Sequence, residues 1–419
     1  MSTYRYPKYD HTQSRAWFDR AQKVIPSGVY GHLGPSEGLF LPIENWPLIS
    51  SRAEGTYFWD MDGNRYLDMM CAYGPNVLGY NDPDVDAAAL AQIRYENCVT
   101  APSHVMVECA ELLVDTVASA DWAFFLKNGT DATTLSILTA RAHTGKKKIF
   151  FLKGYYHGNQ PWAMRADYPG ILPEETANNV ILPWFDLEAL KTAYDEHHGD
   201  VAALIAQPYD HGNFYDNRTA TKEYWASVRQ FCDERGILLI IDDVRAGFRL
   251  DLAGSDHYYG FKADMICFCK ALANGWNMSA VCGREELKST VSSLSFTGSY
   301  WMSAVPMAAC IACIKKMKAL DTPALFREKG TRLTEGLKQA GKRYGFDLVV
   351  SGEPALFYLR VANDDSLMLH QRWVAECVAR GLFITSHHNH FINAALSDQD
   401  IDLAIDIADD AFHALSDQL

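Results

Sequence analysis

The sequence predicts an α/β protein with a mainly parallel central sheet that lies between helices. Short apolar runs rich in β-branched and aromatic residues alternate with longer amphipathic segments through the middle of the 419-residue chain. That alternation is the pattern of successive βα units. The chain is also long enough for two or three lobes around a large core, at about 150 residues per domain.

Five apolar runs are the expected strands, and each ends in a polar or glycine-containing turn. In chain order they cover residues 122–126, 146–152, 202–206, 237–241 and 265–269. In open α/β sheets, ligands bind where the carboxyl ends of such strands converge. We therefore expect one site built from all five strand ends.

Amphipathic segments between these runs predict the helices that cover the sheet. They span residues 105–120, 186–198 and 222–236, and Gly236 closes the last of them. Turn residues at 321–323 suggest a domain boundary. Near the end of the chain, Ser397 followed by Asp400 predicts a capped final helix.

Composition and charge exclude several classes of protein. The formal net charge is −14, whereas nucleic-acid binding needs clustered Lys and Arg to neutralise phosphates, so no nucleic-acid partner is expected. No apolar stretch approaches the ~20 residues of a membrane span, and the N-terminus shows neither a signal peptide nor a transit peptide. These features predict a cytoplasmic protein without a membrane partner.

The ten cysteines are scattered along the chain, several of them inside apolar runs. This distribution favours buried thiols in a reducing compartment over a disulfide framework. The CxxC from Cys310 to Cys313 lies in a helix-like run, and no second pair or flanking His completes a metal site. The neighbouring histidines at 387–390 lack a second ligand group as well, so no bound metal is expected.

Two strand ends carry the strongest chemical signal. Lys270 follows an apolar run, and a desolvated lysine has a lowered pKa that leaves its amine able to attack an aldehyde. A lysine that simply extends to solvent is the alternative. Asp242 and Asp243 end another run, where a buried carboxylate needs a cation such as a protonated pyridinium nitrogen. Two acids that cap the next turn would give the same pattern. An Asp strand end followed some thirty residues later by a Lys strand end, however, indicates such a site more specifically than either residue does alone.

Asn128, Gly129 and Thr130 open an expected helix directly after the first strand. Free backbone N–H groups and the helix dipole can cradle a phosphate there, because glycine allows close approach. An ordinary capped helix would look similar. At the next strand end, Tyr155 or Tyr156 offers a face on which a flat ring can stack, with packing in the core as the alternative.

These residues lie in an ordered series of segments that resembles the class III aminotransferases, pyridoxal-phosphate enzymes of fold type I, nearest to the glutamate-1-semialdehyde aminomutase branch. The segments are GTYFWDMDGNRYLDMMCAYGPNVLGY, KNGTDATTLSILTARAHTG, GYYHG, LLIIDDVRAGFR, CKALANG, TGSYWMSAVPMAA and FINAALSDQDIDLAID. The resemblance covers most of the chain. It implies a fold type I architecture, with a large cofactor domain over 70–322 and a smaller α+β domain formed by 1–69 and 323–419.

The resemblance also implies a role for each matching residue. Lys270 would form a Schiff base with pyridoxal 5′-phosphate, and Asp242 would bind the pyridinium nitrogen. The other implied cofactor contacts are Asn128, Gly129, Thr130, Tyr156, His157, Gln207, Val244 and Ser299. Ser299 aligns with a Thr that relatives contribute to the neighbouring subunit's phosphate site, so the resemblance implies a homodimer with each site at the interface.

Departures from the family pattern concern the substrate more than the cofactor. The aminomutase branch carries an Arg after Pro-Gly-Gly-Val to hold a substrate carboxylate, but Tyr30 follows Val29 here. The residues that would line a polar, aromatic pocket instead are Tyr30, His32, Tyr73 and His388. We therefore expect a neutral or cationic hydroxylated substrate, as in amino-sugar or aminoglycoside biosynthesis.

The expected activity is transamination in two half-reactions, in which an amine donates its amino group and an oxidised amino sugar or aminoglycoside accepts it. An intramolecular aminomutase of the glutamate-1-semialdehyde type, a racemase or epimerase, and a decarboxylase use the same cofactor and are alternatives. A catalytically silent binding protein is another, because Gln207 and Asn128 replace the usual Glu and Ser. Retention of Lys270 and Asp242 favours an enzyme.

Overall fold

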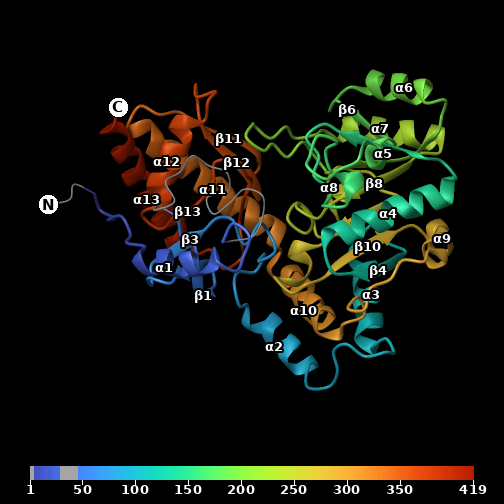
Figure 1. The fold of residues 1–419 in the computed structure, drawn as a ribbon, viewed down its shortest axis with the longest axis horizontal. Coiled ribbons are helices and arrows are strands. Elements are labelled where there is room, and N and C mark those ends of the chain that lie inside the picture. The colour runs from blue at the N-terminus through green and yellow to red at the C-terminus, as the bar shows by residue number, and fades with distance from the viewer. Residues whose placement is uncertain (1–3, 29–45) are drawn as a thin grey trace. The chain divides into compact units, whose positions relative to one another are not determined.

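The computed structural model describes residues 4–28 and 46–419. Contacts within the chain divide it into two compact units, whose elements are labelled in Figure 1. The sheet unit consists of Pro83–His211 and Arg218–Pro323. The terminal unit consists of Gly212–Asn217, Ala324–Leu419 and the described part of Met1–Asp82.

A seven-stranded sheet forms the centre of the sheet unit. Its spatial order is β4 (Trp122–Leu126), β10 (Ser279–Gly283), β9 (Met265–Phe268), β8 (Leu238–Asp242), β7 (Val201–Ala206), β5 (Lys148–Leu152) and β6 (Asn179–Leu182). The strands are parallel except β10, which runs antiparallel to both β4 and β9. The five predicted strands are confirmed, with small differences at their ends. The sequence argument missed β10 and β6, because neither is a long apolar run.

Helices accompany this sheet along the chain, as the amphipathic segments predict. They are α2 (Pro83–Gln92), α3 (His104–Thr116), α4 (Gly129–Thr144), α5 (Pro173–Thr176), α6 (Leu187–Glu196), α7 (Lys222–Arg235), α8 (Ser255–Tyr258), α9 (Lys288–Ser293) and α10 (Ala304–Leu320). The helix expected to reach residue 120 ends earlier, because Val117 adopts an extended conformation. Gly236 closes α7 in the left-handed conformation, as predicted.

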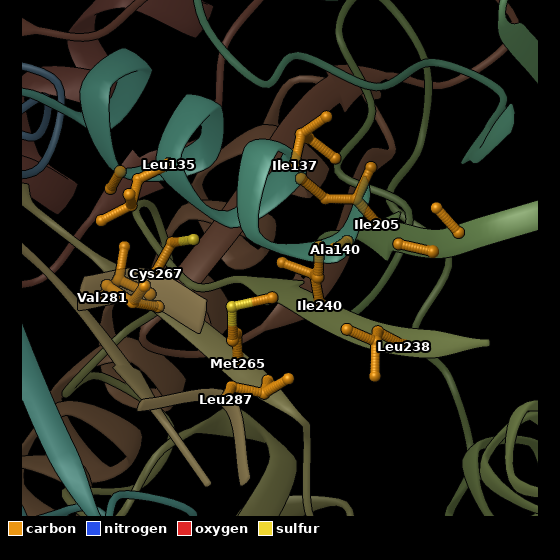
Figure 2. Packing of buried hydrophobic residues seen from close by; sticks show 14 of the residues in the cluster. Leu135, Ile137, Ala140, Ile205, Leu238, Ile240, Met265, Cys267, Val281 and Leu287 are labelled. Atoms are coloured by element: carbon orange, nitrogen blue, oxygen red, sulfur yellow. The ribbon is translucent and has the colours of Figure 1, made fainter. Parts of the chain in front are cut away.

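The buried face of α4 packs against the sheet. Figure 2 shows Leu135, Ile137 and Ala140 of this helix together with side chains of the central strands, among them Ile240 and Met265. Every residue of β7 and β8 is buried, which is typical of parallel strands covered on both faces. Burial stabilises such a core by roughly 25 cal/mol per Å² of apolar surface, and the rigid sheet fixes the positions of the strand ends.

The terminal unit contains two small sheets. One has the order β1 (Ser50–Glu54), β2 (Tyr57–Asp60), β3 (Arg65–Asp68) and β13 (Leu382–Phe383), and the other has β11 (Leu348–Glu353), β12 (Leu356–Val361) and β14 (His390–Phe391). Its helices include α1 (Thr12–Ala21), α12 (Met368–Val378), α13 (Asp398–Ser416) and most of α11 (Thr322–Arg343). Because β13 pairs in parallel with β3, both ends of the chain contribute to one sheet.

The backbone shows the turn predicted at 321–323 and the helix cap predicted at Ser397. Asp321 ends α10 in the left-handed conformation, with φ at 46°. Ser397 begins α13 with a capping box, in which Asp400 accepts the N–H of Ser397 at 2.8 Å. The domain boundaries at 69 and 322 stay a prediction, and the contacts place 70–82 and 212–217 with the terminal unit.

The cysteines are free thiols, and most of them, including Cys310 and Cys313 of α10, are buried. Within residues 4–28 and 46–419, no group of His, Cys, Asp and Glu is arranged to hold a metal ion. None of the described helices is long and apolar enough to cross a bilayer.

Buried histidines make the terminal unit sensitive to acid. His370 and His390 are fully buried, and burial lowers the pKa of each to about 3 from the ordinary 6.5. The unfolded chain therefore takes up these protons at a higher pH than the folded chain. Stability that is fully present above pH 6.5 is lost as the pH falls toward 3, by about 1.4 kcal/mol per pH unit for each histidine.

We expect the urea midpoint of unfolding to fall steeply between pH 6.5 and pH 4.5, and His370→Gln to make this dependence shallower. The exposed His104 provides a matched control, His104→Gln, which should keep the wild-type slope. Equal slopes for His370→Gln and wild type would contradict this account of the acid sensitivity.

Candidate active site

Lys270 lies just beyond β9, at the start of the short 3-10 segment Lys270–Ala273. Its φ of 37° falls in the left-handed region, a strained conformation for a lysine that the surrounding structure must hold in place. Burial, followed by the positive charge of Arg245, lowers the pKa of Lys270 to about 8. Compared with an ordinary lysine, the neutral fraction of the amine near pH 7 rises by about two orders of magnitude. The amine is therefore a competent nucleophile.

Asp242 is the last residue of β8, and its side chain is buried. Its Oδ2 lies 2.6 Å from Nδ1 of His157, and its Oδ1 accepts the backbone N–H of Val244 at 3.1 Å. The opposite ring nitrogen of His157, Nε2, is buried and has no hydrogen-bond partner among the described residues. Asp242 and His157, predicted separately from the sequence, thus form one hydrogen-bonded pair.

The adjacent Asp243 has a different partner, because successive side chains point to opposite sides of an extended chain. Its carboxylate accepts the backbone N–H of Ser255 at 2.9 Å and the hydroxyl of the same serine at 2.5 Å. Burial raises the pKa of Asp243 to about 7. Of the two acids at this strand end, Asp243 therefore caps a turn and Asp242 belongs to the candidate site.

The first turn of α4 has the geometry expected of a phosphate cradle. Asn128 is the N-cap residue, and its side-chain oxygen accepts the N–H of Asp131 at 2.9 Å. Thr130 Oγ1 accepts the N–H of Asn159 at 3.2 Å. A Cβ on Gly158 would lie 2.5 Å from the same oxygen, so only glycine fits beside Thr130. The remaining N–H groups of the turn and the helix dipole favour an anion.

Val244 and Tyr156 are the residues predicted to lie on the two faces of a ring. Val244 packs against Gly129, since a Cβ on that glycine would meet Val244 Cγ1 at 3.0 Å. Tyr156 is 51% exposed, and its hydroxyl donates to Asn159 Oδ1 at 3.0 Å. Tyr155 packs against the core and stacks on His157 with ring centroids 5.4 Å apart. Tyr156 is therefore the tyrosine that a flat ligand can reach.

Two further predicted cofactor residues lie in the sheet unit. Gln207 directly follows β7 and is 5% exposed. Ser299 is exposed, and its backbone carbonyl accepts a hydrogen bond from the thiol of Cys98 at 3.4 Å. The buried position of Gln207 suits a ligand contact within the chain, and the exposed position of Ser299 leaves it accessible to another molecule.

The predicted substrate residues belong to the other part of the chain. Within the terminal unit, Tyr73 and His388 pack edge to face, with ring centroids 5.4 Å apart. Tyr73 also has a left-handed φ of 67°. Tyr30 and His32 lie outside the described residues. The structure thus brings two of the four predicted substrate residues together.

The sequence analysis did not single out three basic residues that lie at this site. Arg245 and Arg249 are buried, and their charges act on Lys270. His211 is 2% exposed, and neither of its ring nitrogens has a hydrogen-bond partner in the described part of the chain. Burial, followed by the charge of Arg245, holds the pKa of His211 well below its ordinary value. A signal was present, because Arg245 directly follows Val244 and Arg249 lies four residues further on, both in the segment already singled out.

A family model described as aminotransferase class-III matches residues 42–412. The chain belongs to the class III aminotransferases. The predicted fold type I architecture and transaminase activity are thereby confirmed, in preference to the mutase and epimerase alternatives.

Relatives of this aminotransferase match it over nearly their whole length. The aminopentol aminotransferase of Sphingopyxis macrogoltabida is 38% identical over 406 residues, which cover 96% of this chain and 94% of the relative. The 3-aminobutyryl-CoA aminotransferase of Cloacimonas acidaminovorans is 27% identical, covering 93% and 94%. The solved FumI protein of Sphingopyxis sp. MTA144, in its PLP internal aldimine form, is 37% identical with a TM-score of 0.92, covering 96% of both chains.

The aminotransferase uses pyridoxal 5′-phosphate, as predicted, and the donor set fits that group. The buried carboxylate of Asp242 is a suitable partner for a protonated ring nitrogen. The first turn of α4 offers N–H groups to a phosphate, and the amine of Lys270 can react with an aldehyde. The roles of individual residues stay predictions.

The charge of Arg245, in addition to burial, should lower the pKa of Lys270 and with it the pH above which its amine reacts. We expect the rate at which the apoprotein captures pyridoxal phosphate to rise with pH around a midpoint near 8. Arg245→Met removes a cation that disfavours the protonated amine, so the midpoint should move up by about one pH unit. Stopped-flow absorbance between pH 6 and pH 10 measures it.

Arg245→Lys retains the positive charge and is the matched control, with a midpoint close to that of wild type. A midpoint that stays unchanged in Arg245→Met, or that moves down, would show that Arg245 does not act on Lys270 in this way.

Proposed function

We propose that this aminotransferase moves an amino group between a polyhydroxylated amine and a carbonyl acceptor, with Lys270 and Asp242 as its catalytic residues. The observation that carries the residue assignment is their common position at one edge of the sheet. Strands β8 and β9 are parallel neighbours in which Asp242 lies opposite Cys267, and Lys270 follows shortly after that cysteine. The carboxyl ends of parallel strands are where ligands bind in such sheets.

When bound, pyridoxal phosphate withdraws electrons from the amine-bearing carbon of the substrate and makes its proton acidic. Asp242, held by His157, would keep the ring nitrogen protonated. Lys270 Nζ would hold the cofactor in the resting enzyme and, once displaced, would move a proton between the amine-bearing carbon of the substrate and the C4′ carbon of the cofactor, as general base and then general acid. The remaining proposed cofactor contacts are Asn128, Gly129 and Thr130 at the phosphate and Tyr156, Val244 and Gln207 around the ring.

A hydroxylated amine is the substrate class that we favour. The relative with 38% identity is named an aminopentol aminotransferase, and this chain has Tyr30 where an arginine would bind a carboxylate. Tyr73 and His388 carry hydroxyl and imidazole groups that can exchange hydrogen bonds with hydroxyl groups of a ligand. We propose these two side chains as substrate contacts, and an oxidised amino sugar or aminoglycoside as the carbonyl acceptor.

Half-reaction spectroscopy tests this proposal. Each candidate amine is added alone to the holoenzyme, and loss of the long-wavelength band of the lysine-bound cofactor is followed. We expect polyhydroxylated primary amines to discharge this band at least tenfold faster than simple alkyl amines of equal length, because two or more hydroxyl groups each add a hydrogen bond of about 1 kcal/mol.

Lys270→Ala is the control for the residue assignment and should show neither the band nor turnover. Normal turnover in that variant would refute the role of Lys270. Discharge of the band by amino acids alone would refute the substrate class and leave the role of Lys270 intact.

We further propose a homodimer in which Ser299 of each subunit contacts the phosphate of the other. Support comes from exposed apolar side chains on α2 and α3, two helices that both pack against α10, and in the segments just after α2 and just before α10. The residues concerned are Leu90, Ile93, Tyr95, Val107, Val114 and Tyr300, with exposed fractions from 36% to 85%. Exposed apolar side chains of this kind, one of which belongs to Tyr300 next to Ser299 in the chain, are typical of a subunit interface.

A charge on this surface should separate the subunits. We expect Ile93→Glu to lower the sedimentation coefficient from that of a dimer to that of a monomer and to reduce activity, because a buried unpaired carboxylate is strongly unfavourable. Leu172→Glu, at an equally exposed leucine away from these helices, is the matched control. A dimer that survives Ile93→Glu at micromolar concentration would argue against this interface.

A cytoplasmic location is also part of the proposal. It is supported by the free thiols of the chain, most of which are buried, since thiols persist in a reducing compartment.

A further inference from the structure

Asn217 fastens the loop Gly212–Asn217 to the rest of the terminal unit. It is 6% exposed, and its Oδ1 accepts the backbone N–H of Gly212 at 2.8 Å, which closes the loop on itself. Its backbone N–H donates to Ser351 Oγ at 2.9 Å, and its Nδ2 donates to the carbonyl of Ser351 at 3.2 Å. A Cβ on Gly352 would lie 2.3 Å from that Nδ2, so only glycine leaves room for the amide. These contacts hold the side chain in one orientation, because the N–H of Gly212 can only donate and must face the amide oxygen.

The same amide oxygen also holds Asn389, the residue after His388. Asn389 is fully buried, and its Nδ2 donates to Asn217 Oδ1 at 2.8 Å. The backbone carbonyl of Asn389 lies 2.8 Å from Nδ1 of His388. Because a carbonyl oxygen can only accept, Nδ1 carries the ring hydrogen, and Nε2 of the neutral imidazole is an acceptor. Asn217 is thus connected to the ring of His388 through a single residue.

The loop also contacts His387, the residue before His388. The backbone N–H of Phe214 donates to the carbonyl of His387 at 3.2 Å, and the two rings stack with centroids 5.2 Å apart. The ring of His387 in turn packs edge to face against that of His388, with centroids 6.2 Å apart. Both chain neighbours of His388 are therefore attached to the loop Gly212–Asn217.

The loop is short and is closed at its base. The chain leaves the sheet unit after His211 and returns to it at Arg218. Asp210 and Arg218 exchange two backbone hydrogen bonds of 3.1 and 3.0 Å, and Nε of Arg218 donates to the carboxylate of Asp210 at 2.8 Å. A loop fixed at its base and by the amide of Asn217 can hold another segment in place, because little of its backbone is free to move.

We propose that Asn217 is a positioning residue for His388, and that it thereby determines the affinity of the enzyme for hydroxylated amines. This role rests on the proposed contact between His388 and the substrate. Asn217 acts through Asn389, which aims the acceptor Nε2 of His388. A hydrogen bond weakens steeply when its angle is poor, so a rotated imidazole binds a hydroxyl group less well. A substrate hydroxyl can donate to Nε2, whereas a carboxylate has no hydrogen to donate.

A pair of primary amines of equal length, one polyhydroxylated and one alkyl, provides the test. Discharge of the long-wavelength band of the holoenzyme is followed at increasing amine concentration, which separates the apparent Kd of the amine from the limiting rate. We expect Asn217→Ala to raise the apparent Kd of the polyhydroxylated amine by roughly fivefold, as for loss of one hydrogen bond. Its limiting rate, and both values for the alkyl amine, should stay close to those of wild type.

Three further variants sharpen the test. Asn389→Ala removes the same hydrogen bond from its other side and should raise the apparent Kd by a similar factor, so the test does not depend on the folding of one variant. In His388→Phe, which keeps a ring against Tyr73, adding Asn217→Ala should have no further effect. Asn178→Ala, at a partly exposed asparagine of the sheet unit, is the matched control and should behave as wild type.

An equal loss of affinity for both amines in Asn217→Ala, or no loss for either, would overturn the proposal. So would a loss that persists in the His388→Phe background, because Asn217 would then act by another route. A wild-type enzyme that does not distinguish the two amines would instead refute the proposed substrate class, and unchanged affinities in His388→Phe would refute the contact of His388. In either of these two cases the role of Asn217 is refuted as well.

Discussion

The hydrogen bond between His157 and Asp242 fixes the geometry on which the candidate site depends. It joins the turn after β5 to the end of β8, two strands that are separated in the sheet by β7. The backbone carbonyl of His157 also accepts the hydroxyl of Thr133 from α4, at 2.7 Å. One histidine thus connects a strand end, a turn and the helix that carries the proposed cradle. These contacts and the packed core beneath them set the distance between the first turn of α4, proposed to bind the phosphate, and Asp242, proposed to bind the ring nitrogen.

Positive charge dominates the same edge of the sheet. Arg245, Arg249 and Lys270 are brought close enough for their charges to interact, and His211 is buried beside them in a neutral form. Together with burial, which is the larger cause, the charges of Arg245 and Arg249 lower the pKa of Lys270. The cluster also creates an environment that favours an anionic cofactor, so the charge that activates Lys270 assists binding as well.

The central sheet was predictable, and the candidate cofactor residues could be proposed, because both leave local signals in the sequence. Strands such as Val201–Ala206 are uninterrupted apolar runs, and Lys270 and Asp242 directly follow such runs. The small sheets left no comparable signal, since β13 is two residues long and pairs with a strand at the other end of the chain. His211 was missed because its importance arises from burial next to distant residues.

The pairing of β13 with β3 makes the order of synthesis matter for this chain. The ribosome releases β3 long before β13, so the four-stranded sheet stays incomplete until the C-terminal residues emerge. The sheet unit ends at Pro323 and is fully synthesised earlier. During translation, β3 is therefore without its β13 partner while the sheet unit already has all its strands. Unpaired strand edges of this kind make incomplete chains prone to aggregate.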